Sequence, residues 1–220
     1  MIVVEPVLTE EKLKHLLSEA HEQTELDFKS QLDLSNRGEV IELTKDIAAM
    51  QSNPRGGYIV VGCDDHGQVL TVFTDQAAKL FDEAALRTKV NRYIAEPFEL
   101  RTARFKMDGK NVVLIYVGTN ASGWAVFVCP GEYDKKLVFR VGDVFVRHGS
   151  ASERWVQTDV ERLLTQVIEK RKDQWRAEML KEYDAAYSQS SPVKMLNNLS
   201  ADSLSLELDD DTFATKVDRL

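Results

Sequence analysis

Three stretches of the chain repeat apolar residues at helical spacing, which is the pattern of amphipathic helices. These stretches are residues 8–20, 39–51 and 81–95. Thr9 precedes most of the first stretch and is a residue type that caps helix N-termini, and two glutamates follow it where negative charge stabilises a first turn. A fourth pattern covers residues 156–187 and predicts a helix far beyond the usual length of about 11–12 residues.

Other stretches have the patterns of strands. Residues 25–29 alternate, with Leu26 and Phe28 on one face and only charged residues on the other, which predicts a half-buried strand. Residues 58–62 are almost continuously apolar and predict another strand. Two further apolar runs flank the turn sequence DGK at 108–110 and predict a hairpin.

Residues 137–149, LVFRVGDVFVRHG, predict a second hairpin with a two-residue Gly-Asp turn. In that register one face points to the core and consists of Phe139, Val141, Val144 and Val146. The other face carries Arg140 and Arg147 on either side of Phe145, a combination that could grip phosphate and stack a nucleic-acid base. The alternative is a surface hairpin whose arginines lie over apolar neighbours and reach into water.

The composition favours a soluble domain with a sizeable core, since 43% of the 220 residues are hydrophobic and 29% are charged. No run of 18 apolar residues predicts a transmembrane helix, and the first residues lack the pattern of a signal peptide. Cys63 and Cys129 lie in apolar stretches without CxxC spacing. They therefore favour reduced, buried thiols and a cytoplasmic location, and they argue against a structural zinc site.

The net charge of −8 argues against a protein that coats nucleic acid without specificity. The charge is uneven, however. Residues 101–148 hold eight basic and four acidic residues, whereas residues 199–220 hold six acidic and two basic ones. The local basic region is compatible with a specific nucleic-acid-binding face.

The sequence contains none of the short motifs that mark several common enzyme classes. It has no Walker A pattern, which counts against ATP binding, and no GxSxG, HExxH or GxGxxG. The four histidines are scattered along the chain, so a hydrolase built on a Ser-His or Cys-His pair has no local support.

Charged residues crowd the segment at 22–31, EQTELDFKSQ, which includes Glu22, Glu25, Asp27 and Lys29. Such a cluster is usually solvated at a strand edge or a helix start. A group of carboxylates can also hold Mg²⁺ or Mn²⁺, because these ions prefer several oxygen ligands. Glu25 shares a strand face with Asp27 and could support it or be solvated.

The segment CDDHG at 63–67 places Asp64 and Asp65 where the preceding strand ends. These acids could join the same carboxylate group, or they could cap a turn without any metal. His66 could serve as an acid or base beside them, or it could be an exposed turn residue. Arg55, in the loop NPRGG, could contact a phosphate that approaches the glycine backbone closely, or it could lie in a simple turn.

Three segments occur in the order EQTELDFK, LTKDIAAMQSNPRGGYIVVGCDDHG and VFVRHGSASERW. In this order, over about residues 19 to 165, they resemble the Schlafen AlbA_2 family, which comprises nucleic-acid-binding domains related to the core of vertebrate Schlafen proteins. The resemblance implies an α/β (α+β) fold with a mixed β-sheet flanked by helices. We therefore predict an AlbA_2-like domain at 1–155, a long helix at 156–187 and an acidic tail at 188–220.

The resemblance also implies a site, because Schlafen relatives that cleave RNA use three carboxylates. It maps these onto Glu22, Asp27 and either Asp64 or Asp65, while Lys29 matches the family lysine. Asp27 replaces the more usual glutamate and is shorter by one methylene. The implied function is an endoribonuclease acting on structured RNA, with Mg²⁺ or Mn²⁺ held by Glu22, Asp27 and Asp65. In such a site the metal would activate water and the lysine would neutralise the scissile phosphate.

Two other interpretations stay open. In one, the chain binds RNA or DNA or takes part in an assembly without catalysis, and its carboxylates are vestigial.

The second concerns the C-terminal arm, where Trp175, Met179 and Tyr183 lie on the far part of the long helix and the tail repeats Leu204, Leu206 and Leu208. We expect this arm to contact neighbouring subunits in a homo-oligomer or a larger assembly. The alternative is a tail that folds back on its own domain.

Overall fold

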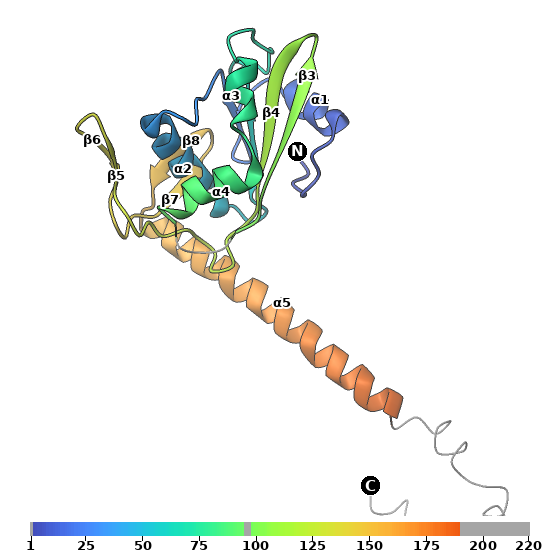
Figure 1. Ribbon diagram of the computed structural model, residues 1–220. Coiled ribbons are helices and arrows are strands. Elements are labelled where there is room, and N and C mark those ends of the chain that lie inside the picture. The colour runs from blue at the N-terminus through green and yellow to red at the C-terminus, as the bar shows by residue number, and fades with distance from the viewer. Residues whose placement is uncertain (1, 95–97, 190–220) are drawn as a thin grey trace, which may run out of the picture. The chain divides into compact units, whose positions relative to one another are not determined.

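The computed structural model describes residues 2–94 and 98–189, with side chains up to residue 185 (Figure 1). The chain divides into two units, residues 1–169 and residues 170–220. This boundary lies inside the long helix at 157–189. The predicted tail at 188–220 lies almost entirely outside the described residues.

The first unit is built around a mixed sheet of four strands in the order β1–β2–β4–β3. β1 runs parallel to β2, and the other neighbouring pairs are antiparallel. The strands are β1 Leu26–Lys29, β2 Gly57–Val61, β3 Leu100–Met107 and β4 Lys110–Val117. The strands predicted at 25–29 and 58–62 are confirmed and lie side by side in this sheet, and the hairpin around the DGK turn is confirmed as well.

Two helices cover the two faces of this sheet. α1, Glu10–Ser18, contributes Leu13 and Leu16 to the core cluster that includes Phe28 of β1. The Thr9 cap is confirmed, because its side chain accepts a hydrogen bond from the backbone of Lys12 at 3.2 Å. α2, Arg37–Gln51, contributes to the second core cluster on the opposite face, which also contains Ile59 and Val61 of β2. α4, Glu83–Asn91, lies within the range 81–95 where the sequence predicted a helix, and the short α3, Asp75–Lys79, precedes it and was not predicted.

The predicted hairpin at 137–149 is wrong. Its two strands belong to separate two-stranded ribbons, β5–β6 and β7–β8. The strands of these ribbons are β5 Gly131–Tyr133, β6 Lys136–Phe139, β7 Phe145–His148 and β8 Ala151–Arg154. The segment 140–143 that joins the ribbons forms a turn, in which the backbone of Asp143 donates to the carbonyl of Arg140 at 3.2 Å. Val141, which we expected in the core, is 62% exposed.

Turn geometry explains this difference. Asp134 and Lys135, between β5 and β6, both have positive φ angles, of 45° and 63°. Two such residues form the turn whose twist matches a hairpin. In the turn at 140–143 only Gly142 has a positive φ, of 85°. A single positive φ at the third turn position belongs to a type II turn, which splays the flanking strands instead of pairing them.

α5, Gln157–Gln189, confirms the long helix predicted at 156–187. Asp159 accepts a hydrogen bond from the backbone of Val156 at 2.9 Å and so satisfies one donor at the start of the helix. Among the described residues, no helix combines the length and the apolar character needed to cross a membrane.

His148 connects the β7–β8 ribbon to the start of α5. Its ring nitrogens lie 2.9 Å from Glu153 Oε2 and 3.0 Å from Asp159 Oδ1. Hydrogen bonds to Glu153 and then to Asp159 raise the pKa of His148 above its ordinary value. A raised folded-state pKa stabilises the fold below the unfolded pKa, near 6.5, and this stabilisation is lost as the pH rises through the folded pKa.

We therefore expect His148→Gln to lower the melting temperature more at pH 5.5 than at pH 9. The effect is modest, because the imidazole is exposed and water screens its two ion pairs. Thermal melts of both proteins at the two pH values measure it. A difference in melting temperature that is the same at pH 5.5 and pH 9 would contradict the prediction.

Candidate functional site

Asp27 lies in the middle of β1 on the face that α2 covers. It is only 1% exposed, so the expectation of a strand with one solvated face is wrong. Tertiary packing explains the burial, because α2 and the ribbon that contains β7 pack against one another beside this face. A buried carboxylate needs partners to offset the loss of water.

Arg147 of β7 is the first of these partners and is itself only 4% exposed. Its Nη1 donates to Asp27 Oδ1 at 3.0 Å and to Ser152 Oγ at 3.4 Å. Its Nη2 donates to the backbone carbonyl of Gln23 at 3.3 Å, while its Nε is buried and has no hydrogen-bond partner among the described residues. The guanidinium that we expected on a nucleic-acid-binding surface therefore lies inside the domain and joins β7 to β1.

Lys29 is the second partner. Its Nζ lies 2.6 Å from Asp27 Oδ2 and 3.3 Å from Asp46 Oδ2 on α2. Burial by itself would lower the pKa of Lys29, but the negative charges of Asp46 and Asp27 outweigh burial and raise it. Lys29 therefore stays charged and, with Arg147, completes a four-residue network that we call the buried ion network: Asp27, Lys29, Asp46 and Arg147.

Asp46 was missed from the sequence, although a signal was present. It lies among Leu43, Ile47 and Met50 on the apolar side of the helix pattern, and an acid at such a position needs a buried cation. Arg147 carried no comparable signal. Its side-chain direction follows from the β7–β8 pairing, which the sequence did not reveal.

Glu22 lies beside the network. Its Oε1 accepts a hydrogen bond from the backbone of Phe28 at 2.9 Å. Burial raises the pKa of Glu22, and the negative charge of Asp27 raises it further. Glu22 therefore contributes to the acidic character of the site, but one of its oxygens already accepts a hydrogen bond from the backbone of β1.

Asp64 and Asp65 follow β2 in the turn suggested by the sequence. Asp64 Oδ1 accepts from the backbone of His66 at 3.0 Å and from that of Gln68 at 2.9 Å, which is a turn cap. Asp65 and His66 are exposed. Burial raises the pKa of the neighbouring Cys63 to about 12, and the charges of Asp64, Asp27 and Asp65 add to the shift. Cys63 is thus a buried, protonated thiol.

The carboxylates of Glu22, Asp27 and either Asp64 or Asp65 are not arranged to bind a divalent ion together. Among the residues that the structure describes, no group of three or more His, Cys, Asp or Glu side chains is placed to hold a metal. Asp27, the central member of the expected set, already contacts Arg147 and Lys29. Two cations of the chain, Arg147 and Lys29, therefore take the place that a metal would need.

Of the four residues expected on the nucleic-acid face, Arg140 and Arg55 are exposed, whereas Phe145 and Arg147 are buried. Arg140 and Arg55 are exposed, and in the described part of the chain no ion pair involves either guanidinium. Phe145 is buried and packs edge-on against Phe127, with ring centroids 5.9 Å apart. The guanidinium of Arg154 lies 5.5 Å from the Phe145 ring centre. Phe145 therefore belongs to the core and does not offer a free face to a base.

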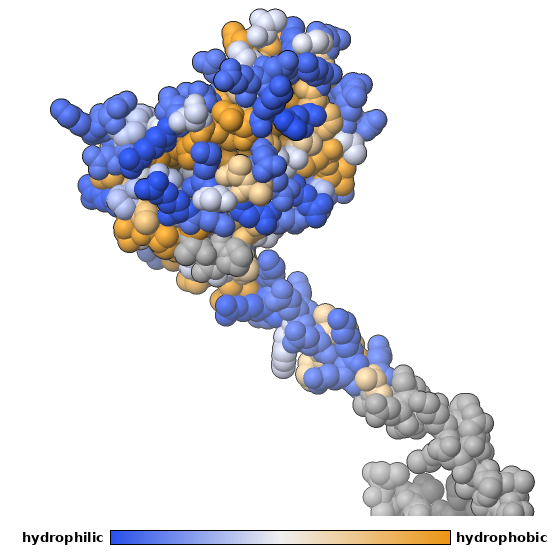
Figure 2. All heavy atoms as spheres, viewed as in Figure 1, coloured by the Kyte–Doolittle hydropathy of each residue, from blue (hydrophilic) through white to orange (hydrophobic). Residues whose placement is uncertain are grey.

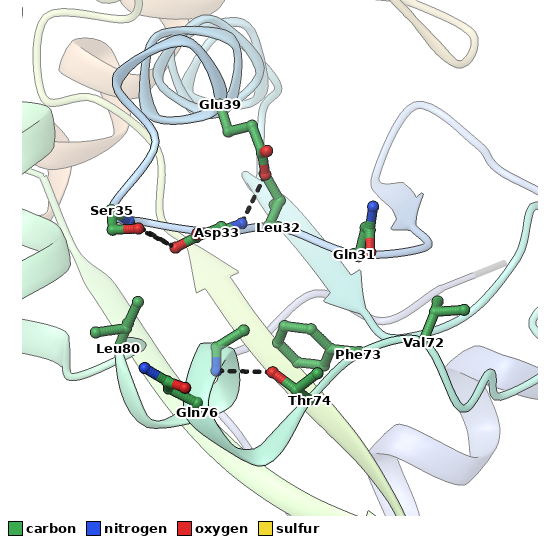
Figure 3. A pocket seen from close by; sticks show the side chains of 11 residues that line it. Gln31, Leu32, Asp33, Ser35, Glu39, Val72, Phe73, Thr74, Gln76 and Leu80 are labelled. Carbon is green, nitrogen blue, oxygen red and sulfur yellow. Dashed lines mark hydrogen bonds between the residues drawn. The ribbon is translucent and has the colours of Figure 1, made fainter.

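A pocket of about 530 Å³ lies between the segment that follows β1 and the segment around α3. Figure 3 shows Glu39 reaching from α2 toward Asp33, whose backbone donates to the Glu39 carboxylate at 2.6 Å, with Phe73 and Thr74 on the facing wall. Its charged lining residues, Asp33 and Glu39, are both acidic. Acidic walls disfavour phosphate, so this pocket is a poor fit for nucleic acid.

Residues 22–156, more than half of the chain, match the family model described as Schlafen, AlbA_2. No curated protein matches the chain. Among solved structures, the chain is similar to the DIP2311 protein from Corynebacterium diphtheriae, with 17% sequence identity, coverage of 65% of this chain and a TM-score of 0.42. The chain spans 25% of the length of that protein.

Proposed function

We propose that this chain, which belongs to the Schlafen AlbA_2 family, binds RNA or DNA without cleaving it. The family connects the chain with a nucleic-acid-related function. One observation favours binding over cleavage: Asp27 is buried and both of its oxygens contact cations of the same chain. In this proposal the buried ion network holds the ribbon β7–β8 against the main sheet and takes no part in chemistry.

The exposed arginines are the groups suited to phosphate. A guanidinium offers several N–H donors in a planar fork and matches a phosphate better than an ammonium does. Arg140 extends from the turn between the two ribbons, and Arg55 from the loop between α2 and β2. Neither guanidinium forms an ion pair within the described residues, unlike Arg154, which pairs with Asp143 at 2.9 Å.

We expect Arg140→Ala and Arg55→Ala each to weaken binding of labelled single-stranded RNA or DNA. Each contact that is lost should reduce the slope of log affinity against log salt by about 1, because fewer counterions are released on binding. Fluorescence anisotropy at several salt concentrations measures both effects. Arg101→Ala is the matched control, because this exposed arginine already pairs with Glu99 at 2.6 Å.

If Arg140→Ala and Arg55→Ala bind as tightly as the parent, these two arginines do not form the interface. If the parent binds neither RNA nor DNA at low salt, the proposed function is wrong. A reduction that appears equally in Arg101→Ala would show only a general effect of net charge.

The alternative is the metal-dependent endoribonuclease that the family resemblance implies. Incubation of the pure protein with tRNA and Mn²⁺, with and without a chelator, separates the two functions. We expect no cleavage in either sample. Mn²⁺-dependent cleavage that disappears in both Glu22→Ala and Asp27→Asn would establish the enzyme and overturn binding without catalysis. Cleavage that persists in the double variant would come from a contaminating nuclease.

A further inference from the structure

The part of α5 that belongs to the second unit carries exposed apolar side chains on one side. Trp175 is 64% exposed and Met179 is 51% exposed, and Leu180 and Tyr183 are exposed as well. Trp175, Met179 and Tyr183 are spaced by four residues, which places them along one stripe of a helix with 3.6 residues per turn. Figure 2 shows hydrophobic side chains interleaved with hydrophilic ones along α5. Exposed apolar side chains gathered along one side of a helix are a mark of an interaction surface.

The charges along the same segment are antisymmetric about Ala177. Before it the chain reads K-R-K-D-Q-W-R, and after it E-M-L-K-E-Y-D. Each charged residue at a given number of positions before Ala177 has a residue of opposite charge at the same number of positions after it, with one exception. The pairs are Arg176 with Glu178, Asp173 with Lys181, Lys172 with Glu182, and Lys170 with Asp184. Arg171 is the exception and corresponds to Tyr183.

This pattern matters because of how two identical helices can pack. In an antiparallel pair centred on Ala177, a residue before the centre lies level with the residue equally far after the centre in the partner. Trp175 then lies level with Met179 of the other copy, and both are on the exposed stripe. The basic stretch at 170–172 lies beside the acidic stretch at 182–184. A parallel pair would instead place each basic stretch beside its own copy, which is unfavourable.

We propose that α5 pairs with α5 of a second copy of this chain in an antiparallel arrangement, with the two-fold axis at Ala177. Such an isologous contact uses the same surface on both copies. The described side chains of this segment, 170–185, extend over about 24 Å of helix at 1.5 Å per residue. The aromatic and thioether groups of Trp175 and Met179 form its centre, and complementary charges select the antiparallel orientation.

Sedimentation velocity on the full chain over a range of concentrations tests the association. We expect a dimer for the parent and a monomer for Trp175→Gln, a substitution that keeps a helix-compatible residue and adds no charge. Val141→Gln is the matched control, because Val141 is about as exposed but lies in a turn outside α5. It should remain a dimer. A parent that is monomeric at all concentrations, or a Trp175→Gln variant that remains dimeric, would overturn the proposal.

Disulfide cross-linking tests the orientation. Lys172→Cys and Glu182→Cys are made separately in a Cys129→Ser background, while the native Cys63 is buried. The antiparallel pair predicts a disulfide-linked dimer when the two variants are mixed under reducing conditions and then oxidised. Each variant alone should link poorly, because residues 172 of the two copies lie about 15 Å apart along the axis. Efficient linking of Lys172→Cys alone would overturn the antiparallel arrangement.

A different occupant of the stripe gives a different result. If the segment at 190–220 of the same chain covers Trp175, the parent is a monomer, and the mixture of the two cysteine variants does not cross-link between chains. That outcome would replace the second copy with an intramolecular partner. Nucleic-acid binding is tested separately by Arg140→Ala and Arg55→Ala, so failure of either proposal leaves the other readout intact.

Discussion

Replacing Arg147 with methionine is expected to lower the free energy of unfolding by about 3–5 kcal/mol. The substitution keeps an apolar side chain of similar length but removes the guanidinium, which leaves the buried Asp27 with Lys29 as its one remaining cation among the described residues. Chemical denaturation of the parent and of Arg147→Met measures the loss. Arg140→Ala, which removes an exposed arginine, should change stability by no more than about 0.5 kcal/mol.

A double-mutant cycle tests whether the loss comes from the ion pair itself. Asp27→Asn removes the carboxylate charge with almost no change in shape. The double variant Asp27→Asn/Arg147→Met should lose less stability than the sum of the two single variants, by about 0.5–3 kcal/mol, since the two residues are in direct contact. Strictly additive losses would show that Arg147 stabilises the domain by packing and not through Asp27.

Gly56→Ala is expected to destabilise the domain on the order of 3–5 kcal/mol, which is at the upper end for a single substitution. Gly56 has a φ of +76°, and a Cβ at this position would lie 2.0 Å from the carbonyl oxygen of Val117. Val117 is in β4, which pairs with both β2 and β3, so its backbone cannot move away cheaply. The glycine pair of the NPRGG loop therefore leaves space for the chain's own backbone to approach closely. This role is separate from the phosphate contact proposed for this loop.

Gly142→Ala is the control that separates steric overlap from backbone strain. Gly142 also has a positive φ, of +85°, but apart from its two neighbours in the chain no described residue has an atom within 4 Å of the position of its Cβ. It should lose only the cost of a left-handed conformation, about 1–2 kcal/mol. Thermal and denaturant unfolding of both variants provide the comparison, and equal losses would show that the contact with Val117 has no effect.

The resemblance read from three segments of the sequence is confirmed by the family match over residues 22–156. The mixed sheet flanked by helices, which the resemblance implied, is present in the structure. The strands at 25–29 and 58–62, the Thr9 cap and the long helix were predicted from the residues themselves and are also present. These features depend on residue periodicity, capping and turn chemistry, which act over a few positions and are therefore visible in one sequence.

The candidate site could not be derived in the same way. The cluster at 22–31 was recognised as charged, but its surroundings depend on Asp46 of α2 and Arg147 of β7, the latter 120 positions away from Asp27 in the chain. Because of the type II turn at 140–143, β7 pairs with β8 and not with β6, and the side chain of Arg147 is buried in the domain. The sequence alone thus determined which elements form and which residues carry charge. Only the tertiary structure decided that Asp27 is buried and neutralised, because burial and ion pairing depend on contacts between segments far apart in the chain.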